Sequence, residues 1–290
     1  MHTSEMKKKP ASNPAIYSFI LLSISIMTLI FSTDLTAQGN LMVFPRRVVF
    51  EGLKRSQEIN IANTGVDTAR YVISFVNYRM KENGEFEEIT QPDSGQNFAD
   101  KYIRFFPRSV VLAPNEAQIV RVQVIRNNQI SPGEYRSHLY FRAVPAEKPL
   151  GEKDLKDTTS ISIKLLPIFG MTIPVIVRVG ESTARVNIFD ISFKMVNDTL
   201  PTISLAFKRT GNISVYGDIA FDHISPLGKI TRVNFVQGMA IYTPNLVRRF
   251  KVNLDRTLGV DYRKGKLHIV YSSQSAAKPE KYAEADWYLH

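Results

Sequence analysis

Apolar side chains recur at every second position over an unusually long run near the middle of this chain. From Ile161 to Val177 every odd-numbered residue is apolar, whereas the even-numbered positions include serine, lysine, glycine and threonine. A repeat of two is that of a β-strand, whose side chains point alternately to the two faces of a sheet. The run is much longer than the roughly five or six residues of an ordinary strand. We therefore expect a strand along the length of a sheet, with Pro167 and Pro174 at an edge or a bend because proline cannot donate to the ladder.

Shorter runs with the same repeat fill the chain from Leu41 onward, with turn residues between them. No stretch there sustains the apolar repeat of an amphipathic helix, so the pattern predicts an all-β protein. A length of 290 residues predicts two domains, and the spacing of the strands predicts a β-sandwich for the first and another small sandwich or barrel for the second. We place the first at 38–178, with the long strand 161–178 at its end, and the second at 179–290. The other strands are expected at 41–50, 56–62, 69–78, 103–112, 118–125, 133–144, 184–193, 202–208, 215–223, 229–236, 247–254, 266–271 and 283–289, and a polar loop at 146–159.

The first 37 residues have the pattern of a secretory signal peptide. Three lysines, Lys7 to Lys9, precede an uncharged apolar run from Ala15 to Thr33, and Ala37 offers a small residue for cleavage before Gln38. The alternative is an uncleaved inner-membrane anchor, because the run approaches the roughly 18 residues that a membrane span needs. In either case we expect everything after Gln38 to lie outside the cytoplasm.

Cysteine content and charge exclude several classes of protein. The chain has no cysteine, which excludes disulfides, thiolate nucleophiles and cysteine-ligated zinc sites. Its formal charge is +10, but the lysines and arginines are scattered along the chain, and an exported protein is not expected to meet nucleic acid. We expect the excess positive charge to act on an acidic surface or on carboxylates of a partner chain.

The sequence contains no recognisable catalytic or metal-binding motif. No histidine has another histidine at zinc-binding spacing, and there is no nucleophile elbow, phosphate-binding loop or dinucleotide fingerprint. Glu85, Glu87 and Glu88 flank a turn and are expected at a solvated hairpin end, and His138 is expected to be packed or surface-facing. We predict no enzyme activity, no metal and no cofactor, although carboxylates on separate strands could still converge on a site that the sequence does not reveal.

Two adjacent arginines at the start of the first strand stand out. Arg46 and Arg47 precede Val48, Val49 and Phe50. Because neighbouring residues of a strand face opposite sides, both arginines cannot share a face. Arg46 is expected in solvent, whereas Arg47 is a candidate for an inward-facing guanidinium, which would need a carboxylate partner.

At this point the sequence resembles the periplasmic chaperones of pilus and fimbria assembly. Their first domain opens with an arginine-bearing strand, R-x-[VI]-[FY], and continues with S-x-x-[IVL]-x-[IVL]-x-N. This chain has Arg47–Phe50 and then Ser56–Asn63. Further matches to the family patterns are Pro107–Pro114 with Gln118–Val122, Pro132–Tyr135, Phe141–Pro145 and, less specifically, 241–244, 248–250 and 265–267 in the second domain.

The resemblance implies two immunoglobulin-like domains in an L or boomerang arrangement, and a chaperone without enzyme activity. Such a chaperone lends its long strand to a secreted β-rich, pilin-like subunit that lacks one, and alternate apolar side chains fill the subunit's groove. Arg47 would then grip the terminal carboxylate of the subunit, through the paired hydrogen bonds that a guanidinium offers. The donated face would consist of Ile161, Ile163, Leu165, Phe169, Met171 and Ile173. The alternative for this stretch is ordinary core.

The chain departs from the family at the residue that accompanies the arginine. The family has a lysine on the later part of the long strand, and the matching position here is Pro174. Either Lys164 or Arg178 takes its place, or the carboxylate is anchored differently. The resemblance also implies a periplasmic location, delivery to an outer-membrane assembly protein, and self-association through the long strand when empty. The alternative function is a structural or adhesive envelope protein with the same fold and no client.

Overall fold

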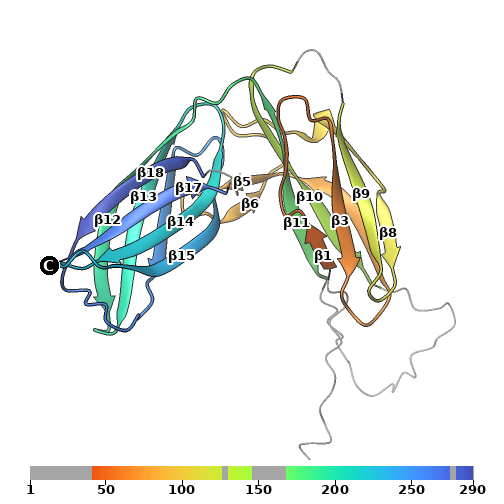
Figure 1. Ribbon diagram of the computed structural model, residues 1–290. Helices are drawn as coiled ribbons and strands as arrows, with labels where there is room; N and C mark the ends of the chain where they lie inside the picture. Colours follow the sequence, from red (N-terminus) through yellow and green to blue (C-terminus); the bar gives the residue numbers. More distant parts are fainter. Residues whose placement is uncertain (1–40, 126–129, 146–167, 275–278, 290) are drawn as a thin grey trace, which may run out of the picture. The chain divides into compact units, whose positions relative to one another are not determined.

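The computed structural model describes residues 41–125, 130–145, 168–274 and 279–289, and these residues are almost entirely β-strand (Figure 1). One short 3-10 helix, η1, lies at Asp100–Tyr102. Within the described residues no helix is long and apolar enough to cross a membrane. The strands are β1 (Leu41–Phe44), β2 (Val48–Phe50), β3 (Ser56–Asn63), β4 (Ala69–Val76), β5 (Tyr78–Met80), β6 (Phe86–Glu88), β7 (Ile103–Phe106), β8 (Ser109–Leu112), β9 (Ala117–Val124), β10 (Gly133–Val144), β11 (Gly170–Val179), β12 (Arg185–Val196), β13 (Leu200–Thr210), β14 (Val215–Ile224), β15 (Ile230–Ile241), β16 (Val247–Asn253), β17 (Lys266–Ser273) and β18 (Lys281–Tyr288).

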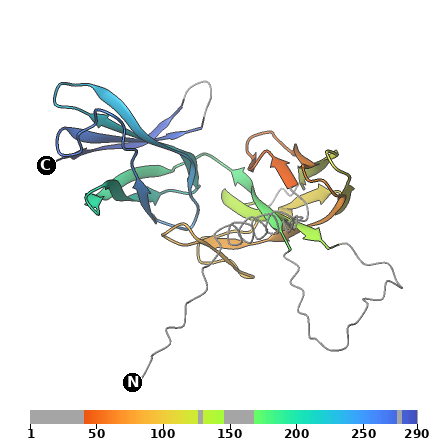
Figure 2. The same cartoon turned by 90° about the horizontal axis from the view of Figure 1, so that it is seen from below.

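These strands form two β-sandwiches, which confirms the predicted all-β, two-sandwich fold class (Figures 1 and 2). The first pairs the sheet β1-β3-β9-β7 with the sheet β2-β11-β10-β4-β8, and the second pairs β12-β13-β16 with β15-β14-β17-β18. A separate two-stranded hairpin, β5-β6, follows β4. The predicted signal peptide and the predicted 146–159 loop lie outside the described residues.

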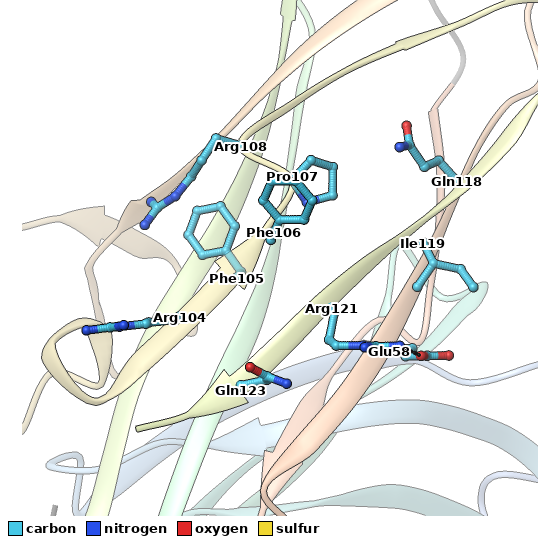
Figure 3. A pocket seen from close by; sticks show the side chains of 10 residues that line it. All are labelled: Glu58, Arg104, Phe105, Phe106, Pro107, Arg108, Gln118, Ile119, Arg121 and Gln123. Carbon is cyan, nitrogen blue, oxygen red and sulfur yellow. Dashed lines mark hydrogen bonds and ion pairs between the residues drawn. The ribbon is translucent and has the colours of Figure 1, made fainter. Parts of the chain in front are cut away.

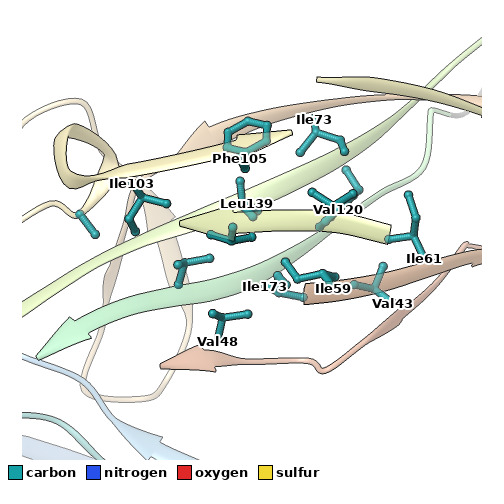
Figure 4. Close-up of a cluster of buried hydrophobic side chains, with 14 of the residues drawn as sticks. Val43, Val48, Ile59, Ile61, Ile73, Ile103, Phe105, Val120, Leu139 and Ile173 are labelled. Atoms are coloured by element: carbon teal, nitrogen blue, oxygen red, sulfur yellow. The ribbon is translucent and has the colours of Figure 1, made fainter. Parts of the chain in front are cut away.

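Each sandwich has its own apolar core, made by the alternate residues that face inward from both of its sheets. In the first, Val48, Ile59, Leu139 and Ile173 are among the residues that interlock between the layers (Figure 4). The second is centred on large side chains that include Phe207, Phe221 and Tyr271. The Tyr271 hydroxyl donates to the Met239 carbonyl at 2.9 Å, so its burial leaves no unsatisfied donor.

Two of the predicted strands are each divided by a proline. The expected strand 41–50 ends at Phe44, and the chain enters the other sheet as β2 after Pro45, Arg46 and Arg47. The expected strand 103–112 is likewise β7 in one sheet and β8 in the other, with Pro107 between them. A proline cannot continue a ladder as a donor, so each marks the point where the chain leaves one sheet for the other.

The long alternating run is described from Ile168 onward, and β11 occupies Gly170–Val179. This strand lies between β10, with which it pairs over its whole length, and β2, which it meets only at Val175–Val177. Pro174 is therefore the last residue of β11 before the stretch that pairs with β2. The proline was expected at an edge, and it stands where the edge of β11 ends.

Candidate functional site

Arg47 lies immediately before β2 and faces away from the core of the first sandwich. Val48 and Phe50 on the same strand are fully buried in that core, so Arg47 and Val49 point to the opposite face. The Arg47 guanidinium stacks on the Tyr216 ring, 4.5 Å from its centroid, and its Nη1 donates to the Tyr242 hydroxyl at 2.8 Å. The idea that Arg47 points into the core is therefore wrong, whereas Arg46 is exposed as expected.

Arg47 also lacks the carboxylate partner that the sequence led us to expect. Within the described residues, no Asp or Glu lies within ion-pair distance of its guanidinium. Aromatic rings and one hydroxyl hold it instead, through cation–π attraction and a single hydrogen bond. The charge of Arg47 is therefore not neutralised by a direct contact from the described part of the chain.

Two residues of β10 share this face with Arg47. In the ladder between β10 and β11, His138 is opposite Pro174 and Arg136 is opposite Ile176, and Ile176 is in turn opposite Val49 of β2. Residues directly opposite each other in a sheet point to the same side, so Arg136, His138 and Arg47 all face away from the first core. We call the two arginines the cationic cluster, and His138 lies on the same face.

Arg136 is the more deeply buried member of the cationic cluster, with 2% of its surface exposed. Its Nη2 donates to the carbonyls of Tyr78 and Thr243 at 3.3 and 3.4 Å, and its Cζ lies 4.2 Å from the centroid of the Tyr242 ring. Its Nε and Nη1 have no hydrogen-bond partner. Burial lowers the pKa of this guanidinium, and Arg47 lowers it further, against the opposing effects of Tyr242 and Glu134.

His138 is buried between aromatic rings. The rings of Tyr78 and Phe86 meet the imidazole edge to face, at centroid distances of 5.1 and 5.8 Å, and its Nδ1 has no hydrogen-bond partner. Burial, followed by the charges of Arg136 and Arg47, lowers the pKa of His138 to about 3. The ring is therefore neutral at ordinary pH, and the expectation that it is packed holds.

Glu134, two residues before Arg136 on β10, is engaged elsewhere. Its side chain is fully buried and its Oε2 accepts from Arg178 Nε at 3.1 Å and from Ser214 Oγ at 2.7 Å. Oε2 also accepts from the Ser214 amide, and Oε1 accepts from Thr243 Oγ1 at 3.3 Å. Because Ser214 and Thr243 belong to the second sandwich, this carboxylate joins the two sandwiches.

Arg178, a sequence-based candidate for the missing family lysine, does not join the cationic cluster. It pairs with Glu134 and Glu51, and its Nη2 donates to the Ser214 carbonyl at 2.9 Å. Its charge is thus matched by two carboxylates of the same chain. The other candidate, Lys164, lies outside the described residues.

The predicted donated face is only partly in the described region. Ile161, Ile163 and Leu165 lie outside it, and Phe169 is 50% exposed. Ile173 is 1% exposed in the first core, and Met171 packs against the same core. These two assignments are therefore corrected to core, which was the alternative: once β11 lies between β10 and β2, its odd-numbered residues point into the sandwich.

A second surface lies on the outside of β7 and β9. Here an open hollow is lined by ten residues, including the exposed Phe106 and three arginines, Arg104, Arg108 and Arg121 (Figure 3). Arg121 pairs with Glu58 at 3.0 Å, and Arg108 stacks on the ring of Phe105. Ile103 and Phe105 are buried while Arg104 and Phe106 are exposed, which is ordinary strand alternation. Across the described residues, no group of three or more His, Asp or Glu side chains is arranged to hold a metal ion.

Arg136 and Glu134 were not predicted from the sequence to be site residues. The available signal was that three successive even positions of the strand 133–144 carry ionisable side chains, Glu134, Arg136 and His138, while Tyr135 and Leu139 are apolar. That alternation predicts one polar face, which is usually a solvated one. It does not show that Thr243, Tyr242 and Ser214, about 80 to 110 residues away along the chain, cover this face.

No protein-family model matches the chain, and no curated protein does. Among solved structures, it is similar to the class 5 fimbriae chaperone CfaA, with 12% identity, 87% of this chain and 99% of that chain covered, and a TM-score of 0.39. It is also similar to a chain of the CsuC–CsuE chaperone–tip adhesion subunit pre-assembly complex of Acinetobacter baumannii, with 12% identity, coverage of 85% and 97%, and a TM-score of 0.42.

A third similar structure is the E. coli chaperone DraB, with 10% identity, coverage of 88% and 98%, and a TM-score of 0.41.

The low pKa of His138 predicts a pH dependence of stability. Between about pH 6.5, where an unfolded histidine titrates, and the folded pKa of about 3, only the unfolded state binds the proton. The contribution of His138 to the free energy of unfolding is therefore fully present above about pH 6.5. It falls by about 1.4 kcal/mol for each pH unit below that, down to the folded pKa of about 3. We expect urea unfolding of His138→Phe to lack this slope relative to the parent protein, and equal slopes in both proteins would contradict the assignment.

The two carboxylates that pair with Arg178, Glu134 and Glu51, are predicted to contribute unequally to stability. Glu134→Gln leaves Arg178 without its buried partner, so we expect a loss of about 3–5 kcal/mol in the free energy of unfolding. Glu51→Gln removes the exposed partner of the same arginine and should cost about 1 kcal/mol or less. Denaturant unfolding of both variants measures the difference, and similar small losses would show that Glu134 does not join the sandwiches.

Proposed function

We propose that this chain is an exported chaperone that binds a secreted β-rich, pilin-like subunit and supplies it with a β-strand. The observation that carries the proposal is Arg47, a half-buried guanidinium beside the uncovered edge of β11 with no carboxylate partner in the described part of the chain. The motif Arg47–Phe50, with its resemblance to the pilus-assembly chaperones, supports the same function.

The edge of β11 offers a place for a client strand. β2 covers β11 only at Val175–Val177, so the backbone of Gly170–Pro174 has a strand partner on the β10 side alone among the described residues. An uncovered strand edge can pair with a strand from another chain, and alternate side chains then enter the partner's pockets. Ile168 and Phe169, just before this edge, are about half exposed and apolar.

Arg47 lies at the end of that edge, because its neighbour Val48 is opposite Val175 of β11. A client strand paired along Gly170–Pro174 would therefore end beside the Arg47 guanidinium. A terminal carboxylate there would gain charge-assisted hydrogen bonds, which are stronger than neutral ones. The client's end would thus fix the register of the added strand.

The proposal includes the compartment and the further partners. The basic and apolar segment at 1–37 would direct the chain to the periplasm, and an outer-membrane assembly protein would receive the client. An empty chaperone would shield its uncovered edge by pairing with a second copy. The chain would work without cofactor or metal, and by binding rather than by catalysis.

The test is capture of a subunit from an envelope extract by tagged protein. We expect the parent chain to recover one small β-rich subunit at one to one, and Arg47→Ala to lose at least about tenfold of it, since one charge-assisted pair is worth about 1.5–3 kcal/mol. Arg46→Ala is the matched control, because Arg46 is adjacent and exposed.

Equal capture by both variants would remove the arginine anchor. A folded parent chain that recovers no subunit would support the structural or adhesive envelope protein instead.

A further inference from the structure

One short chain segment, between β11 and β12, connects the two sandwiches. β11 ends at Val179 and β12 begins at Arg185. Domains linked by so few residues move relative to each other unless further contacts hold them. The hydrogen bonds of Glu134 provide one such contact. Because a contact at one place still allows rotation about that place, a fixed arrangement of the sandwiches requires a second.

The hairpin β5-β6 provides a second contact, although it belongs to none of the sandwich sheets. It follows β4 of the first sandwich directly and is tied to the loop that comes after it. Arg79 pairs with Asp93 at 2.8 Å, and the Gln96 amide donates to the Tyr78 carbonyl at 3.0 Å. The turn of the hairpin contacts β16 of the second sandwich. We call residues 78–88 the clasp.

One face of the clasp is apolar and packs on both sandwiches. Met80 is opposite Phe86 in the hairpin, so the two side chains point to the same side. Met80 is 6% exposed and packs with Ile176 of the first sandwich and with Ala240 and Tyr242 of the second. The ring centroids of Phe86 and Tyr242 are 6.1 Å apart. This cluster is separate from the two sandwich cores, so its apolar surface stays buried only while the clasp and both sandwiches remain together.

The turn of the clasp is hydrogen-bonded to β16. The Glu82 carbonyl accepts from the Arg249 amide at 2.7 Å and from Arg248 Nη1 at 3.1 Å. The Glu82 carboxylate also pairs with Arg249 Nε at 3.3 Å, but both side chains are more than half exposed, and an exposed ion pair contributes little. The hydrogen bonds to the Glu82 carbonyl therefore provide most of the attachment.

Gly84 allows the turn to approach β16 this closely. Its φ of 88° is in the left-handed region that favours glycine, and a Cβ atom at this position would overlap the Arg248 guanidinium. The guanidinium of Arg248 therefore lies directly on the backbone of the turn. Its Nε has no hydrogen-bond partner among the described residues, so packing contributes to holding this side chain as well as hydrogen bonds.

We infer that the clasp fixes the two sandwiches in one arrangement, and that its attachment to β16 is the contact whose loss releases them. With the turn detached, the sandwiches rotate about the contacts that remain, at Glu134 and Met80. The inference does not depend on the proposed function, because it concerns contacts within this chain alone.

The absence of cysteine from the chain makes a direct distance measurement possible. Spin labels are attached to the full-length protein through Gln118→Cys on β9 and Lys194→Cys on β12, which are exposed positions in different sandwiches. Double electron–electron resonance then gives the distribution of distances between the two labels. We expect a single narrow distribution in the parent protein.

Deletion of Glu82 detaches the turn and preserves the hairpin. It leaves Asn83 and Gly84 between Lys81 and Glu85, and Asn-Gly is a preferred two-residue hairpin turn. We expect the width of the distance distribution to increase at least twofold. Glu82→Ala is the matched control, because it removes the exposed carboxylate but keeps the carbonyl, and it should leave the width unchanged.

A broad distribution in the parent protein would overturn the inference, whether or not the deletion variant folds. An unchanged width in a deletion variant with the circular dichroism spectrum of the parent would overturn it as well. Neither result bears on capture of a subunit from the envelope, so failure of the clasp and failure of the chaperone proposal are distinguishable.

Discussion

The hydrogen bonds of the buried Glu134 carboxylate determine which arginines of this region are neutralised and which are not. The carboxylate is fully buried, and it accepts hydrogen bonds from Arg178 on β11 and from Ser214 and Thr243 of the second sandwich. A single acidic side chain thereby neutralises Arg178 and fixes the segment that carries Tyr242. With Glu134 so occupied, Arg136 on β10 and Arg47 at the start of β2 carry positive charge that no direct contact in the described chain offsets.

The unpaired positive charge lies beside a strand, β11, that β2 covers only in part. β2 is only three residues long, so it covers β11 only at Val175–Val177, and no other described strand pairs with Gly170–Pro174 on that side. A free backbone edge and an unpaired cationic cluster at its end fit the same kind of ligand, an extended strand that ends in a carboxylate. The edge provides hydrogen bonds along the strand, and the cluster provides the charge that fixes its register.

The sequence predicted the fold well because strand alternation is a local signal. The run 133–144 is β10 to the residue, and most other strands differ from the expected ranges by a few residues. The errors at 41–50 and 103–112 arose because the apolar pattern continues through Pro45 and Pro107 while the chain moves to the other sheet. Periodicity shows which residues share a face, but not which sheet they join.

The site was harder to predict, for a different physical reason. Arg47 was found from its motif and from its parity with Val49, yet the role expected for it within its own sandwich was wrong. Arg136 and His138 look like residues of a solvated strand face. Thr243 and Tyr242, far away in sequence, cover Arg136, and the rings of Tyr78 and Phe86 cover His138. Met171 and Ile173 were misassigned because core and donated faces have the same period of two.

The most direct test of this account is the accessibility of the client's carboxyl terminus. A subunit captured by this chain would be exposed to carboxypeptidase, and the loss of its terminal residues would be followed by mass spectrometry, in comparison with the same subunit after release. The account predicts that the bound terminus resists digestion and that the released terminus is trimmed. Equal rates of trimming would contradict it, because a carboxylate held by Arg47 cannot enter a protease active site.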